Sequence, residues 1–231
     1  MRHRSLALAL VSGAAFVGAA HATELQSISK LAFGPQDTLF VADWKAGQVE
    51  ALSLPAAAGH ADAPYNVLNL DQVIRAVVGT ADVKVESLAK RPGTDEVYLA
   101  LSVGADSKPA ILIVTPDGNA RALDLATVQA TTGKLEDAPD GTYKFWDRTP
   151  MRSFTVTDMR WHAGKLFVAG LSNQTFASSL RILGYPFGGA QSISSIAMYH
   201  TSHNQIETRA PIRTMSFATI DGRDTLIAAL T

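Results

Sequence analysis

Short runs of apolar residues, separated by polar turn residues, recur along this chain. The runs are rich in branched and aromatic side chains, which favour β-strands. One pattern of two runs joined by a turn returns four times, at residues 28–33 with 39–42, 85–90 with 97–100, 156–161 with 166–169, and 212–217 with 226–229. Each pair is typical of two adjacent antiparallel strands, so the sequence predicts an all-β fold built from repeats.

Further apolar segments follow these pairs, at residues 48–54, 110–115, 120–125, 179–187 and 194–200. One insertion has a helical period instead, because Leu70, Val73, Ile74, Val77 and Val78 fall on a single helical face. We therefore predict a short α-helix over residues 69–78, with Asn69 as its N-cap and Gly79 as its C-terminal stop. The polar residues 131–150 have no clear period, and we predict a long loop there.

Three or four antiparallel strands per unit predict the blades of a β-propeller. The units start near residues 28, 85, 156 and 212. This spacing exceeds the roughly 40–50 residues of a compact blade, so insertions are expected. Propellers close with about four to eight blades, yet the sequence stops at Thr231, directly after the second strand of its fourth unit. We expect the sequence to be truncated at its C-terminus; the alternative is an open or strand-swapped arrangement that closes by dimerisation.

The first unit reads Leu31-Ala-Phe-Gly-Pro-Gln-Asp-Thr-Leu-Phe-Val-Ala-Asp43, followed by Gly47-Gln-Val-Glu. This segment resembles the repeats of NHL-type and SMP-30-like six-bladed propellers. The other three units match it in part, with Leu101, Gly170 and Leu230 in the place of Asp43. The resemblance implies a propeller fold. It implies no single function, because such propellers include lactonases, dehydrogenases, lyases and binding scaffolds.

The N-terminal segment has the pattern of a secretory signal peptide. Arg2 and Arg4 precede an apolar run that ends at Ala20-His21-Ala22, so we expect cleavage before Thr23 and a propeller domain over residues 23–231. The run is too short to span a bilayer, and a lipoprotein leader would need a cysteine. The sequence therefore predicts a bacterial Sec-type leader and a soluble periplasmic or secreted protein, with no membrane insertion after cleavage.

The composition excludes several kinds of covalent link and binding site. The chain contains no cysteine, which excludes disulfides, thiolate metal sites and c-type haem. Without its leader the chain would carry 18 basic and 21 acidic residues, and no basic cluster is interleaved with aromatic residues. We therefore expect no binding of nucleic acid. Phosphate-binding loops and the familiar hydrolase motifs are also missing from the sequence.

Polar residues within the first strand of each unit are the candidate ligand-binding residues. Inner strands line the central channel of a propeller, and Lys30, Glu86, Asp158 and Arg213 interrupt these apolar segments. Side chains alternate along a strand, so the four residues cannot all point the same way. The alternative is that they form hydrogen bonds and ion pairs that hold the units in register.

One local cluster could bind a metal ion. A tight turn at His203-Asn204 would place His200 opposite Glu207 on one face of a hairpin. Imidazole nitrogen and carboxylate oxygen suit a divalent metal such as zinc, so His200, His203 and Glu207 are the candidate ligands. The set is incomplete without a fourth partner, and the alternative is a surface pair that only stabilises the turn.

Two functional hypotheses follow from these observations. The first is an exported β-propeller that serves as a binding or interaction module, because the repeats are clear and catalytic motifs are missing. The second is a periplasmic propeller enzyme, either a lactonase-like hydrolase or a quinoprotein-like dehydrogenase, as the resemblance and the histidine cluster allow. The sequence identifies neither a cofactor nor a small-molecule or protein partner.

Overall fold

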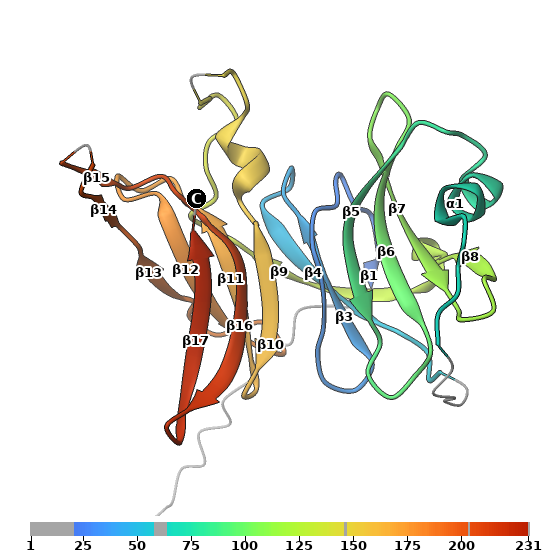
Figure 1. Cartoon of the computed structure of the whole chain (residues 1–231). Helices are drawn as coiled ribbons and strands as arrows, with labels where there is room; N and C mark the ends of the chain where they lie inside the picture. Colours follow the sequence, from blue (N-terminus) through green and yellow to red (C-terminus); the bar gives the residue numbers. More distant parts are fainter. Residues whose placement is uncertain (1–20, 58–63, 146, 203, 231) are drawn as a thin grey trace, which may run out of the picture.

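The computed structural model describes residues 21–57, 64–145, 147–202 and 204–230. Antiparallel β-sheets make up most of this part of the chain, accompanied by one α-helix, so the predicted all-β class is confirmed (Figure 1). Within these residues, no helix has the length and apolar character that a membrane span requires. The predicted signal peptide falls almost wholly on residues 1–20, outside the described residues.

The first sheet has five strands in the order β1-β9-β4-β3-β2. They are β1 (His21–Ala22), β2 (Leu31–Phe33), β3 (Thr38–Asp43), β4 (Gln48–Ser53) and β9 (Gln129–Lys134). The second sheet has the order β5-β6-β7-β8, with β5 (Val83–Lys90), β6 (Val97–Val103), β7 (Lys108–Val114) and β8 (Ala120–Ala122).

The third sheet has the order β10-β11-β12-β13. Its strands are β10 (Asp158–His162), β11 (Lys165–Leu171), β12 (Ser178–Gly184) and β13 (Ser192–Ser195). Two hairpins follow: β14 (Met198–His200) with β15 (Gln205–Glu207), and β16 (Ile212–Ile220) with β17 (Arg223–Leu230). Single 3₁₀ turns occur at Leu125–Thr127 and Met151–Phe154.

The hairpins β2–β3, β5–β6, β10–β11 and β16–β17 coincide with the four strand pairs that the sequence repeats predict. Their inner strands lie next to one another, with β2 between β5 and β10, and β10 between β2 and β16 (Figure 1). The second unit therefore lies beside the first on the side away from the third unit. The spatial order of the four units is two, one, three, four.

Strand β3 explains why the apolar run of the first unit is continuous. Leu39 and Val41 pack with Tyr98 of the second sheet in one core cluster. Phe40 packs in another cluster with Met159 of the third sheet. Because the strand is covered on both faces, alternation between apolar and polar residues is lost, as in other fully buried strands. All six residues of β3 are buried.

The predicted helix is present as α1 (Leu70–Val78), which packs its apolar face on the second sheet through Ile74. Gly79 ends it with a left-handed backbone conformation (φ 76°), and its N–H donates to the carbonyl of Arg75. Asn69 occupies the N-cap position, but its side chain makes no capping hydrogen bond. Its main-chain carbonyl instead accepts from the N–H groups of Gln72 and Val73.

Three sequence expectations need correction. The predicted loop at residues 131–150 begins with most of strand β9, which pairs with β4 and completes the first sheet. Thr132 contributes a hydroxyl that donates to the Glu50 carboxylate at 2.9 Å, and a Cβ at Gly133 would lie 2.9 Å from the Phe187 ring. The predicted strand at 120–125 ends at Ala122, and the one at 194–200 is split between β13 and β14.

Candidate functional site

Inner strands β5 and β16 each contain a β-bulge at the same position of the repeat. In β5, Val85 pairs with Leu101 and Ser87 with Ala100, so Glu86 has no directly opposed partner. In β16 the register shifts between Ile212 and Thr214, so Arg213 is the extra residue. A bulge bends the strand and redirects the side chain of its extra residue. The bulges thus set the direction of the Glu86 and Arg213 side chains.

The other two units have an equivalent irregularity. Ala42 of β3 is hydrogen-bonded to two successive residues, since it accepts from the Ser29 N–H at 3.1 Å and donates to the Lys30 carbonyl at 3.0 Å. In the third unit, Ala169 is paired with the first residue of β10 and also accepts from the Thr157 N–H at 2.8 Å. Ser29, Glu86, Thr157 and Arg213 hold the same place in the aligned repeats.

These four residues line one cleft of about 760 Å³. Each belongs to a different repeat unit, and the inner strands of these units lie side by side (Figure 1). The volume lies in the usual range of small-molecule sites. Lys30 also lines the cleft, so three of the four ligand-binding candidates from the sequence, Lys30, Glu86 and Arg213, are brought together there.

The Glu86 carboxylate has a fixed position in the cleft. Glu86 is 18% exposed, and its two carboxylate oxygens have separate partners. The Ser102 hydroxyl donates to Oε1 at 2.8 Å, and the Lys84 ammonium lies 2.9 Å from Oε2. Lys84 itself is 75% exposed, so this ion pair is accessible to water and weak. Glu86 can therefore accept hydrogen bonds from a ligand without a change of rotamer.

The guanidinium of Arg213 is positioned by an aromatic ring. Its Cζ lies 5.0 Å from the centroid of the Phe154 ring, within cation–π range. Phe154 is held in turn by Phe145, with ring centroids 5.4 Å apart in an edge-to-face arrangement. Arginine stacked in this way still presents N–H donors in its plane, which suits recognition of a carboxylate.

Lys30 and Ser29 of the cleft have spare hydrogen-bonding capacity. The ammonium of the half-buried Lys30 forms no hydrogen bond or ion pair with another residue that the structure describes. The Ser29 hydroxyl is buried and has no hydrogen-bond partner among the described residues. Buried polar groups are normally satisfied, so an unpaired hydroxyl beside a cleft is a group that a ligand could engage.

Asp158 does not line the cleft. It is buried, and its Oδ2 accepts from the Met215 N–H of the neighbouring strand β16 at 2.7 Å. Its Oδ1 accepts from the Met159 N–H at 2.9 Å and lies 3.0 Å from a guanidinium nitrogen of Arg160. The contact with Met215 joins the third and fourth units, so Asp158 has the structural role that was the alternative for the inner-strand polar residues.

The structure gives the histidine hairpin a different register. Strand β14 ends at His200, which pairs with Gln205, and Glu207 pairs with Met198. The expected direct pairing of His200 with Glu207 is therefore wrong, because the turn between the strands is longer than two residues. His203 lies outside the described residues. Among those that are described, no three His, Asp or Glu side chains form a group able to hold a metal ion.

Other residues of the cleft were not among the ligand-binding candidates from the sequence. Trp44 and Lys45 follow β3, and the Lys45 ammonium lies 5.6 Å from the centre of the Trp44 ring. Phe154 comes from the segment between β9 and β10, and no sequence pattern places that segment beside an inner strand. Four cationic and two acidic side chains line the cleft, namely Lys30, Lys45, Lys84 and Arg213 with Asp82 and Glu86.

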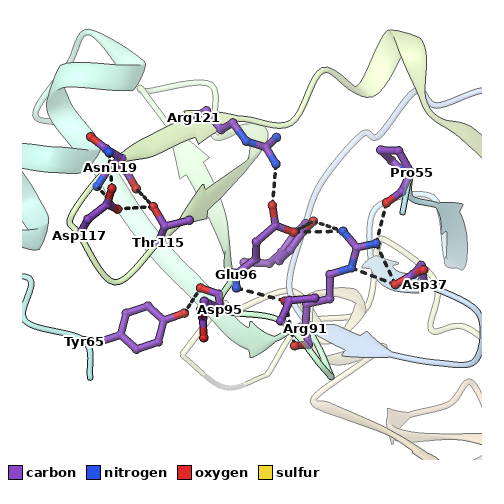
Figure 2. A network of polar contacts seen from close by, with 12 residues as sticks. Asp37, Pro55, Tyr65, Arg91, Asp95, Glu96, Thr115, Asp117, Asn119 and Arg121 are labelled. Carbon is purple, nitrogen blue, oxygen red and sulfur yellow. Dashed lines mark hydrogen bonds and ion pairs between the residues drawn. The ribbon is translucent and has the colours of Figure 1, made fainter. Parts of the chain in front are cut away.

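A second polar cluster surrounds Arg91, at the turn between β5 and β6 (Figure 2). Its guanidinium lies 2.8 Å from Asp37, donates to Glu96 at 3.0 Å, and donates to the Pro55 carbonyl at 2.6 Å. Burial opposes the charge of Arg91, but the hydrogen bonds to Asp37 and Glu96 outweigh it and raise its pKa. Asp37 and Pro55 belong to the first unit, so this cluster connects the first and second sheets.

Neighbouring groups of this cluster are also paired with one another. Arg121 lies 2.7 Å from the second oxygen of Glu96, and the Tyr98 hydroxyl donates to Glu96 at 3.0 Å (Figure 2). The Tyr65 hydroxyl donates to the carbonyl of Asp95. A hollow of about 560 Å³ adjoins these residues. Arg91, Glu96 and Arg121 of its lining pair with one another, which distinguishes it from the inner-strand cleft.

No protein-family model, curated protein or solved structure matches this chain.

Proposed function

We propose that this chain is an exported binding module of the β-propeller type, with a small polar ligand held in the inner-strand cleft. One observation carries the proposal. The bulge position of all four repeat units, which is occupied by Ser29, Glu86, Thr157 and Arg213, lines the same cleft. Equivalent repeat positions that differ in chemistry but share one cavity are expected of a binding site, whereas core positions would be uniformly apolar.

Two further features support the same proposal. The inner strands of the four sheets lie side by side, as blades do around the central channel of a propeller, although their spatial order is two, one, three, four and not the order along the chain. The sequence of the N-terminal 22 residues has the charge order, apolar core and small-residue end of a leader. Together these features favour a binding module that acts outside the cytoplasm.

A thermal-shift screen tests this function. A panel of organic acids, sugars, amino acids and nucleotides is added to the wild type and to the Ser29→Ala, Glu86→Gln, Arg213→Gln triple variant. A ligand present at about 100 times its Kd stabilises the folded state by about 2.7 kcal/mol, so a melting shift of roughly 5–10 °C is expected for a chain of this length. The triple variant should lose that shift.

A matched control variant distinguishes loss of the cleft side chains from the general effect of three substitutions. The Ser192→Ala, Asp221→Asn, Arg223→Gln triple variant changes the same chemistry at exposed positions outside the cleft. It should keep the full ligand-induced shift. If no compound stabilises the wild type more than the cleft variant, the proposal is wrong. If the wild type converts a compound and the cleft variant does not, the enzyme alternative replaces the binding module.

A further inference from the structure

A second hollow adjoins the inner-strand cleft. It measures about 520 Å³ and is lined in part by Lys144 and Arg209. Thr149, Phe154 and Arg213 line both this hollow and the cleft. The stacked guanidinium of Arg213 therefore lies at the boundary between two cavities, each of which could accept a small polar group.

The acidic residues of this second hollow are already engaged. Asp147 accepts from the Thr149 N–H and from its hydroxyl, both at 2.9 Å, and the first of these bonds in particular lowers the pKa of Asp147. Glu207 accepts from the main-chain N–H of Arg209 at 2.5 Å. Lys144 and the Arg209 side chain remain as cations on an exposed surface. Both carboxylates stay charged, so the hollow has a small positive excess, three cations with Arg213 included against two carboxylates.

Positive charge in both cavities contrasts with the chain as a whole. The full sequence carries 20 basic and 21 acidic residues. Arg213 belongs to both cavities, and when it is counted once the two linings together hold six cationic and four acidic side chains. A local excess of one sign on a nearly neutral protein attracts ligands of the opposite sign.

We propose that the two cavities together bind one dianionic organic acid, with a carboxylate in each cavity and Arg213 between them. This inference rests on the proposed function, since it names the ligand class of the same cleft. Lys30 is the cation that contacts the carboxylate in the cleft, and Arg209 is the one that contacts the carboxylate in the second hollow. A ligand with two linked acidic groups gains from an effective local concentration for the second group, which two separate monoanions do not have.

A homologous series of ligands tests the two-cavity geometry. Linear dicarboxylates from malonate to suberate, and monocarboxylates of the same chain lengths, are titrated calorimetrically into the full chain at low ionic strength. Affinity should peak at one dicarboxylate length, because a linker that is too short cannot span the cavities and a longer one lowers the effective concentration. The best dicarboxylate should bind at least about tenfold more tightly than the monocarboxylate of equal length.

Single substitutions identify which cavity holds each carboxylate. Arg209→Gln should reduce the best dicarboxylate to the affinity of its monocarboxylate and leave the monocarboxylate within about twofold of its wild-type value. Lys30→Gln should weaken both ligands. Arg223→Gln, an exposed change outside both cavities, should affect neither ligand. Melting curves of each variant without ligand verify that all of them are folded.

The outcomes separate this inference from the proposed function. Equal affinity for monocarboxylates and dicarboxylates at every length would overturn the two-cavity inference and leave the binding module intact. A dicarboxylate preference that survives Arg209→Gln would overturn it as well. If the thermal-shift screen yields ligands that depend on the cleft but include no dicarboxylate, the ligand class is wrong. If it yields no cleft-dependent ligand of any class, the proposed function itself fails.

Discussion

The Arg91 cluster and the inner-strand cleft are built from the same kinds of residues, but they differ in how completely those residues are paired. Arg91 is 2% exposed and bonds to two carboxylates and a carbonyl. In the cleft, the Lys30 ammonium and the Ser29 hydroxyl have no hydrogen-bond partner among the described residues. A saturated network contributes to stability, and an unsaturated one is available for binding.

Position in the fold explains this difference. The Arg91 cluster lies where two β-turns and the end of β4 meet, so partners from two sheets can close around one guanidinium. The cleft residues lie on or directly before the inner strands, with Glu86 and Arg213 on bulges of β5 and β16, and they line a shared space. Polar residues at turns between sheets are thus structural here, and polar residues at inner-strand bulges are functional candidates.

Among the changes that test this comparison, removal of Arg91 should lower the free energy of unfolding the most. Arg91→Ala leaves the carboxylate of Glu96, which is 16% exposed, without its buried cation and breaks the connection to Asp37. Loss of one partner of a buried ion pair typically costs 3–5 kcal/mol, and the partial exposure of Asp37 favours the lower end, about 3 kcal/mol. Chemical denaturation measures this change in the free energy of unfolding.

Arg121→Ala is the matched control for that substitution. Arg121 also pairs with Glu96 but is 61% exposed, so its loss should cost less than about 1 kcal/mol. If Arg91→Ala and Arg121→Ala lower the free energy of unfolding equally, burial does not determine how much an ion pair of this cluster stabilises the fold. Neither variant should change ligand binding in the inner-strand cleft.

Ionisation of Tyr98 at high pH should cause the next largest loss of stability. Burial, followed by the neighbouring Glu96, raises the pKa of Tyr98 to about 12. The folded protein thus resists loss of this proton more than the unfolded chain, whose tyrosines titrate near 10. The stabilisation is complete below pH 10 and is lost as the pH rises from 10 to 12, with a total of about 2–3 kcal/mol.

Denaturation at a series of pH values from 9 to 12 measures this loss. Lysines also titrate in that range, so the relevant quantity is the difference between the wild type and Tyr98→Phe. The wild type should lose more stability than the variant between pH 10 and 12. Parallel curves for the two proteins would contradict a raised pKa for Tyr98 and the burial that causes it.

The apolar pattern predicted most strands because their side chains are buried in a regular way. The four repeated pairs appear as hairpins, and α1 lies where the helical period places it. Strand β9 was missed because its residues Thr131, Thr132 and Gly133 carry no strand pattern of their own. Its place depends on pairing with β4, about 80 residues earlier in the chain, and on the ring of Phe187 above Gly133.

The candidate site was only partly predictable, and the bulges are the reason. A bulge shifts the two-residue alternation by one, so the sequence cannot show which inner-strand residue turns toward the cleft. Lys30, Glu86 and Arg213 were identified as polar interruptions, but Asp158 shares that property and lies in a buried contact with Met215 instead. Phe154 comes from an insertion, whose position follows only from tertiary packing.

Substitution of Lys30 should have the smallest effect on stability. The Lys30 ammonium contacts no charged partner among the described residues, so Lys30→Gln removes no ion pair and leaves no buried carboxylate uncompensated. The free energy of unfolding should stay within about 0.5 kcal/mol of the wild-type value, as for most partly exposed positions. The same variant should bind the dicarboxylate less tightly. Chemical denaturation without ligand and calorimetry with ligand measure the two quantities on one preparation.

A loss of 2 kcal/mol or more in the ligand-free protein, on the order of a broken buried pair, would show that Lys30 is a structural residue like Arg91. The distinction between a saturated structural cluster and an unsaturated binding cleft would then no longer hold.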